Sequence, residues 1–122
     1  MALHEGAPSA SAEDIQARLD AVRKEVAVLI PPPFNRFQNS FSHIFAGGYA
    51  AGYYSYKWAE VLSADAFSRF EEEGIFNEQS GRDFVRCVLE SGGVNEPLEN
   101  FTAFRGRGPE IDALLRHSGL SS

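Results

Sequence analysis

The sequence has a single cysteine, no excess of basic residues and no long apolar run, and each shortage excludes a class of protein. Cys87 cannot form a disulfide within the chain and is typical of a reducing compartment. The net charge of −6 argues against nucleic acid or an anionic membrane surface as a partner. No apolar run approaches the roughly 20 residues of a membrane span, so we expect no membrane association.

The N-terminus lacks the features of an export signal. Residues 1–5 form neither a basic region nor an apolar one, so we expect no signal peptide and a cytoplasmic location. Residues 1–10 are small and polar and predict a flexible N-terminal segment. The remaining residues, 11–122, are enough for one domain of ordinary size.

Metal ligands are also scarce. The histidines His4, His43 and His117 are far apart, and neither His-Glu-x-x-His nor Cys-x-x-Cys occurs. Because a zinc site needs three or four converging ligands, the sequence predicts no metal site in this chain. Cys87 lies on the apolar side of an expected helix, which predicts a buried structural thiol and not a nucleophile.

Strand signals are absent, and the sequence predicts an all-α fold of about five helices. Ser11 is expected to cap the first helix. Its apolar residues share one face from Ile15 to Leu29, and the prolines at 31–33 are expected to end it.

Four further helices are expected after the prolines. A long helix should start between positions 49 and 55 and end at Gly74. Asn77 is expected to cap the third helix. Pro97 and Pro109 are each expected at the first position of the last two helices, because proline is well tolerated there.

The most unusual segment is 41–58, which is rich in glycine and tyrosine. It holds all four tyrosines, the only tryptophan, and glycines at 47, 48 and 52. Glycine weakens a helix and frees the backbone. The segment therefore predicts a mobile loop that carries hydrogen-bond donors and can grip a ligand.

Some aromatic residues of this segment are expected to pack inside the protein. Tyr54 and Trp58 are four residues apart, and Val61 lies beside them on a helix. These three residues are predicted to belong to the core.

The other tyrosines allow two interpretations. Tyr49, Tyr53 and Tyr56, with His43 before the glycines, could donate hydrogen bonds, because a phenol is neutral at pH 7. Tyr49 and Tyr56 would share a face if both were helical. The alternative is that they pack in a core or an interface, and residue types alone favour packing.

A longer motif adds a family resemblance. The run Phe-Ser-His-Ile-Phe-Ala-Gly-Gly-Tyr-Ala-Ala-Gly-Tyr-Tyr-Ser-Tyr-Lys-Trp at 41–58 continues as Ala-Glu-Val-Leu-Ser-Ala-Asp-Ala-Phe. With residues 70–76, the glycines at 92–93 and the Phe-Arg-Gly-Arg at 104–107, it resembles the C-terminal region of M3-family zinc metallo-oligopeptidases. The resemblance is strongest to the bacterial oligopeptidase A branch and covers nearly the whole chain.

The resemblance implies roles for particular residues. In the family, a His and two Tyr bind the substrate backbone and the oxyanion of the tetrahedral intermediate, and they correspond to His43, Tyr49 and Tyr56. Tyr49 and Tyr56 would be the catalytic oxyanion donors. Gly47 and Gly48 would belong to the substrate-binding loop. The family's zinc is held by His-Glu-x-x-His and a later Glu, in a region that precedes this one.

We therefore expect residues 11–122 to be a C-terminal fragment of a zinc-dependent oligopeptidase that hydrolyses short peptides. The chain alone should hold no cofactor and be inactive, with zinc in the parent enzyme. Its expected partners are peptide substrates and the rest of the peptidase. Self-association through exposed Phe34, Phe37 and Phe41 is also expected. The alternative is a stand-alone helical module that binds a peptide or a protein.

Overall fold

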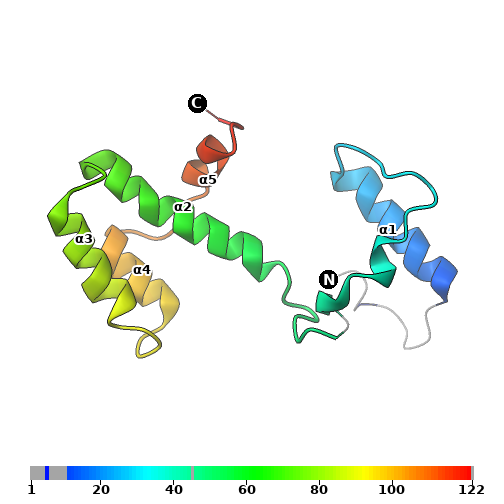
Figure 1. Cartoon of the computed structure of the whole chain (residues 1–122), viewed down its shortest axis with the longest axis horizontal. Helices are drawn as coiled ribbons and strands as arrows, with labels where there is room; N and C mark the ends of the chain where they lie inside the picture. Colours follow the sequence, from blue (N-terminus) through cyan, green and yellow to red (C-terminus); the bar gives the residue numbers. More distant parts are fainter. Residues whose placement is uncertain (1–4, 6–10, 45, 122) are drawn as a thin grey trace. The chain divides into compact units, whose positions relative to one another are not determined.

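The computed structural model describes residues 5, 11–44 and 46–121, and it contains no strand among them (Figure 1). The all-α prediction is confirmed. Apart from residue 5, the predicted flexible segment 1–10 lies outside the described residues. The chain divides into two compact units, Met1–Tyr54 and Ser55–Ser122. The elements are α1 (Ala12–Val26), η2 (Phe37–Asn39), η3 (Ser42–Ile44), α2 (Ser55–Glu73), α3 (Glu78–Phe84), η4 (Val85–Leu89), α4 (Pro97–Arg105) and α5 (Asp112–His117).

In the first unit, α1 begins at the predicted cap. The Ser11 hydroxyl accepts a hydrogen bond from the Asp14 amide at 3.1 Å, and the Asp14 carboxylate accepts one from the Ser11 amide at 3.0 Å. The helix ends at Val26, so the predicted extension to Leu29 is wrong. The carbonyls of residues 27–29 would need amide donors at 31–33, and those three residues are prolines without an N–H.

Polar side chains hold the segment after the prolines against α1. Gln38 donates to the side chain of Gln16 at 2.8 Å, and Arg23 donates to that of Asn35 at 3.0 Å. None of the described residues of this unit is fully buried. The apolar face predicted for α1 is therefore only partly covered within the unit.

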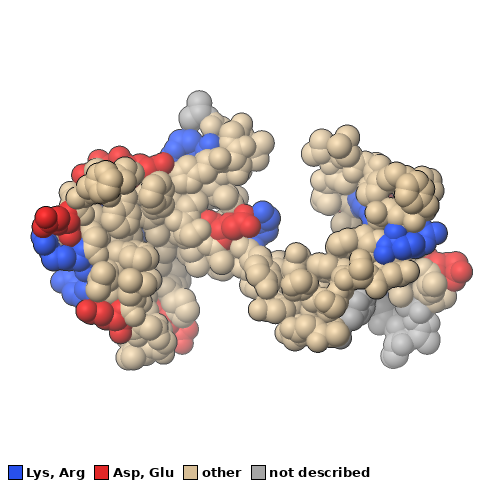
Figure 2. Space-filling view, in the orientation of Figure 1, with Lys and Arg blue, Asp and Glu red and all other residues tan. Residues whose placement is uncertain are grey.

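Apolar and uncharged side chains are prominent on the surface of this unit. Phe34 and Phe37 are exposed, as expected, whereas Phe41 is half-buried. Val28 is almost fully exposed, at 97%. No Lys, Arg, Asp or Glu occurs from 37 to 56, and the corresponding surface is tan in Figure 2.

In the second unit, three predicted helix boundaries are confirmed. α2 ends at Glu73, and Gly74 follows with a φ of 109°, a value that strains other residues. The Asn77 side chain caps α3 by accepting hydrogen bonds from the amides of residues 79 and 80. Pro97 is the first residue of α4.

Two local features differ from the expectation. α3 passes into the π-helical turn η4, a feature without a clear sequence signal. α5 begins at Asp112, so the prediction that Pro109 starts it is wrong. The amide of Glu110 instead donates to the carboxylate of Asp65 at 2.7 Å, which holds this stretch against α2 in a non-helical conformation.

The core of this unit lies where α2, α3 and α4 meet. The rings of Phe70, Phe84 and Phe104 contact one another, with centroids 5.3–6.3 Å apart. Cys87 is buried, as predicted, and Phe101 is also buried. Burial of these rings and side chains contributes to the apolar stabilisation of the unit.

The predicted core role of Tyr54 and Trp58 is wrong within this chain. Their side chains are 65% and 58% exposed, and Val61 is only half-buried. Trp58 does lie on the face of α2 that carries Asp65, because the two are seven residues apart. The ion pairs from α4 and α5 reach Asp65 and Glu71, which lie on later turns of α2 than Trp58.

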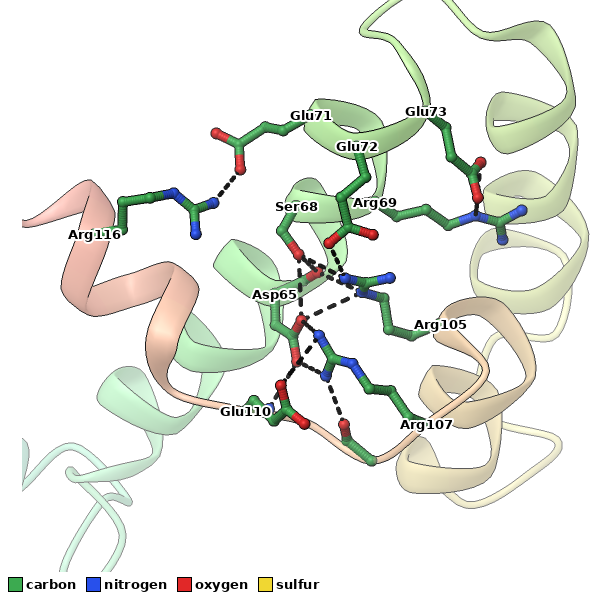
Figure 3. Close-up of polar contacts among 11 residues, drawn as sticks. Asp65, Ser68, Arg69, Glu71, Glu72, Glu73, Arg105, Arg107, Glu110 and Arg116 are labelled. Carbon is green, nitrogen blue, oxygen red and sulfur yellow. Dashed lines mark hydrogen bonds and ion pairs between the residues drawn. The ribbon is translucent and has the colours of Figure 1, made fainter. Parts of the chain in front are cut away.

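The carboxylate of Asp65, near the middle of α2, links α2 to α4 and to the connection that follows α4 (Figure 3). Asp65 is only 1% exposed, and Arg107 binds both of its oxygens, at 2.7 and 2.8 Å. The Nε of Arg105 lies 3.3 Å from the same carboxylate, and its Nη2 donates to Ser68 at 3.0 Å. With the Glu110 amide, Asp65 thus fixes the Arg105–Glu110 connection between α4 and α5 onto α2.

This network predicts a loss of stability in acid. Burial opposes ionisation of Asp65, but hydrogen bonds from Arg107 and the Glu110 amide outweigh it and hold its pKa below the ordinary value. Because its pKa is lower in the folded state, Asp65 stabilises the fold at pH values above its unfolded-state pKa of about 4. This stabilisation is lost progressively as the pH falls from that value through the folded-state pKa. Urea unfolding should therefore show a lower midpoint at pH 3 than at pH 5 or 7. A midpoint independent of pH would contradict the role of Asp65.

Candidate functional site

His43 and Tyr49, two of the predicted site residues, lie side by side in the first unit. His43 is the middle residue of the short helix η3, and Tyr49 follows the two glycines. The Tyr49 amide donates to the His43 carbonyl at 3.2 Å, and the two ring centroids are 5.9 Å apart. The loop from 43 to 49 therefore closes on itself and places an imidazole next to a phenol.

The backbone favours glycine at both positions between them. The Gly47 amide donates to the Ser42 carbonyl at 3.0 Å. A Cβ atom at position 47 would lie 3.1 Å from the Cα and 3.3 Å from the carbonyl oxygen of His43. Gly48 has a φ of 76°, in the left-handed region that favours glycine. These residues shape the turn that brings His43 to Tyr49.

Substitution of either glycine by alanine should disturb this turn. Gly47→Ala would push against the His43 backbone, and Gly48→Ala would cost about 1–2 kcal/mol for its left-handed conformation. We expect both variants to shift the NMR resonances of His43 and Tyr49.

Gly52 provides the matched control for this prediction. A Cβ atom there meets nothing within 4 Å, and its φ is not positive. Gly52→Ala should therefore leave the His43 and Tyr49 resonances in place. Equal effects of all three substitutions would show that the turn has no special need of Gly47 and Gly48.

Tyr56 lies on the first turn of α2 and so belongs to the second unit. Because α2 begins at Ser55, Tyr49 and Tyr53 precede it, and the shared helical face considered for Tyr49 and Tyr56 does not form. The side chains of Tyr49 and Tyr56 are 41% and 45% exposed. Both residues are therefore partly exposed.

The family resemblance gave no substrate-binding role to two aromatic residues that contact His43. The ring of Phe41 is 5.5 Å from that of His43 and nearly parallel to it, and the ring of Tyr53 is 5.1 Å away and edge-on. Sequence spacing could not reveal these contacts, because they depend on irregular backbone between 41 and 53. The only available signal was the concentration of aromatic residues itself.

The described residues do not fit a zinc site. Across residues 5, 11–44 and 46–121, no three His, Cys, Asp or Glu side chains lie close enough together to hold a metal ion. His117 instead pairs with Glu71 at 3.0 Å, and His4 lies outside the described part of the chain.

Among the described residues, no helix has the length and apolarity to cross a membrane.

Residues 1–120 match the family model for peptidase family M3. The chain belongs to this family. It is 60% identical over 99 residues to oligopeptidase A of Salmonella typhimurium, a match covering 81% of this chain and 15% of the relative. It is 56% identical over 118 residues to oligopeptidase A of Haemophilus influenzae, covering 97% of this chain and 17% of the relative. A probable cytosolic oligopeptidase A of Arabidopsis thaliana is 51% identical over 122 residues, covering 97% of this chain and 17% of the relative.

Membership of family M3 confirms the resemblance seen in the sequence. The chain spans only 15–17% of the length of these relatives. A complete M3 peptidase of their size would therefore contain several hundred residues beyond those described above.

Proposed function

We propose that this chain is the C-terminal part of a zinc-dependent M3 oligopeptidase that hydrolyses short peptides, and that it binds the substrate and stabilises the oxyanion. The observation that carries the proposal is the 56–60% identity to bacterial oligopeptidase A over most of the chain. In this proposal His43 and Tyr49 bind the peptide backbone, and Tyr49 and Tyr56 donate to the oxyanion. Gly47 and Gly48 shape the loop that meets the substrate.

The chemistry of the two phenols supports these roles. Hydrolysis of a peptide places negative charge on the former carbonyl oxygen, and donors aimed at this oxygen lower the barrier by roughly 3 kcal/mol each. A tyrosine hydroxyl can donate at neutral pH without carrying a charge itself. The accessible side chains of Tyr49 and Tyr56 and the absence of charged residues from 37 to 56 suit a neutral peptide backbone as ligand.

The remainder of the peptidase is the main partner in this proposal. The zinc ligands would come from that part, since the described residues do not fit a metal site. Exposed apolar side chains such as Val28 and Phe34 would pack against it. A cytoplasmic location is part of the proposal and agrees with the name of the probable cytosolic plant relative.

The chain alone should neither bind zinc in a fixed ratio nor hydrolyse peptides, because its described residues include no set of converging ligands. Metal analysis after dialysis and a quenched fluorescent peptide assay measure both properties. The control is a chimeric peptidase, in which this chain replaces the matching segment of Haemophilus influenzae oligopeptidase A. The chimera should hydrolyse the peptide.

Two outcomes would contradict the proposal. One zinc per isolated chain with zinc-dependent turnover would show that the chain is itself a complete enzyme. A folded but inactive chimera would favour the alternative, a stand-alone module that binds a peptide or a protein.

A further inference from the structure

Five rings in the first unit form a connected cluster, those of Phe37, Phe41, His43, Tyr49 and Tyr53. Phe41 stacks on the imidazole, with centroids 5.5 Å apart and planes inclined by 29°. Tyr53 stands edge-on to both rings, 5.1 Å from His43 and 4.7 Å from Phe41. Phe37 supports Phe41 from a centroid distance of 4.7 Å. His43 therefore has the ring of Phe41 against its face and the rings of Tyr53 and Tyr49 at an angle to it.

The backbone of His43 is fixed separately from its side chain. Its carbonyl accepts the Tyr49 amide at 3.2 Å, and Gly47 lies directly against its main chain. Only the two side-chain torsions remain to be set. A three-residue helix such as η3 offers few neighbours of its own to set them.

We propose that Phe41 and Tyr53 are positioning residues that hold the imidazole of His43 in the orientation needed to bind a peptide. This inference rests on the proposed function, because it concerns the substrate-binding role of His43. Phe41 carries no polar group and can act only by packing. In this proposal Tyr53 acts through its ring in the same way.

Variants of Tyr53 separate the ring from the hydroxyl. Tyr53→Phe keeps the ring, whereas Tyr53→Leu removes the edge-on contacts to His43 and Phe41. Phe41→Leu removes the stacked contact. Tyr54→Leu is the matched control, because Tyr54 is the neighbouring tyrosine and its side chain is largely exposed.

Proton NMR of the 122-residue chain tests the geometry without any assay of activity. The ring protons of His43, assigned by their loss in His43→Gln, should be shifted by the ring currents of Phe41 and Tyr53. Tyr53→Phe and Tyr54→Leu should preserve this shift, and Tyr53→Leu and Phe41→Leu should each change it. Unchanged resonances of α1, which belongs to the same unit, would show that the variants remain folded. A wild-type shift in Tyr53→Leu would overturn the proposal.

Steady-state kinetics of the chimeric peptidase test how the orientation of His43 affects substrate hydrolysis. Tyr53→Leu should lower kcat/KM on the order of tenfold, since even a 1 Å misplacement can cost about 10²-fold. Tyr53→Phe should restore activity to within about twofold. In a His43→Gln background, Tyr53→Leu should cost less than about twofold, because residues that act through one another are not additive.

The outcomes of this cycle distinguish the two proposals. Additive losses from Tyr53→Leu and His43→Gln would overturn the positioning role and leave the proposed function in place. A kinetically silent His43→Gln would remove His43 from the proposed function, and the positioning role would fall with it. Non-additive losses together with the NMR result support both.

Discussion

Tyr56→Phe in the chimeric peptidase should lower kcat and kcat/KM together by on the order of 10² or more, with KM little changed. The substitution removes one hydroxyl from the first turn of α2. If this hydroxyl donates mainly to the developing oxyanion, its loss affects the transition state and not the bound substrate. Steady-state kinetics with a short fluorescent peptide measure both constants. Tyr49→Phe should have an intermediate effect, because Tyr49 would also bind the substrate backbone.

Tyr53→Phe is the control for this experiment. Tyr53 is another tyrosine of the same segment, and its hydroxyl has no role in the proposal. The melting temperature should hardly change in any of the three Phe variants, since each ring is retained. If Tyr56→Phe is kinetically silent, or if its loss of activity follows a drop in melting temperature, Tyr56 is a packing residue and not an oxyanion donor.

Asp65→Asn should destabilise the second unit by about 3 kcal/mol, the largest stability effect that the described contacts predict. Asp65 is almost completely buried, and both of its carboxylate oxygens accept hydrogen bonds from Arg107. Removal of one partner from a buried ion pair leaves the other charge without compensation, which typically costs 3–5 kcal/mol. The partial exposure of Arg107 places the expectation at the lower end of that range. Thermal unfolding followed by circular dichroism should show a melting temperature lower by about 10 °C or more.

A surface ion pair provides the comparison. Glu78 pairs with Arg82 at 3.1 Å on α3, and both side chains are well exposed. Such pairs contribute little to stability, so Glu78→Gln should leave the melting temperature nearly unchanged. Similar effects of Glu78→Gln and Asp65→Asn would mean that the Asp65 network is no stronger than a surface contact.

The helix boundaries that the sequence predicted correctly depend on local chemistry. Ser11, Gly74, Asn77 and Pro97 act through their own backbone or the adjacent turn, and such effects are visible in a short stretch of sequence. The boundary at Pro109 depends on Asp65, which is far away in the chain. Local rules could not foresee it, although an aspartate on the apolar face of α2 was a sign that a basic partner exists.

The residues of the candidate site could be predicted from the sequence, but their contacts could not. His43, Tyr49 and Tyr56 came from the family motif, and the structure places His43 beside Tyr49. The contacts of Phe41 and Tyr53 to His43 were not predictable, because they depend on irregular backbone that follows neither the helix nor the strand period. Likewise, the exposure of Trp58 was not predictable, because helical spacing says which face of a helix a residue lies on and not whether another element covers it.

The absence of charged residues from 37 to 56 has a consequence for how ionic strength affects a bound ligand. Mobile ions screen interactions between charges over a Debye length of about 10 Å at 0.1 M salt, but they hardly affect short contacts between neutral donors and carbonyls. Peptide contacts made by this segment would therefore hold equally well in dilute and concentrated salt. Any salt dependence of substrate affinity, and any preference for charged peptides, would have to arise from charged side chains elsewhere in the peptidase.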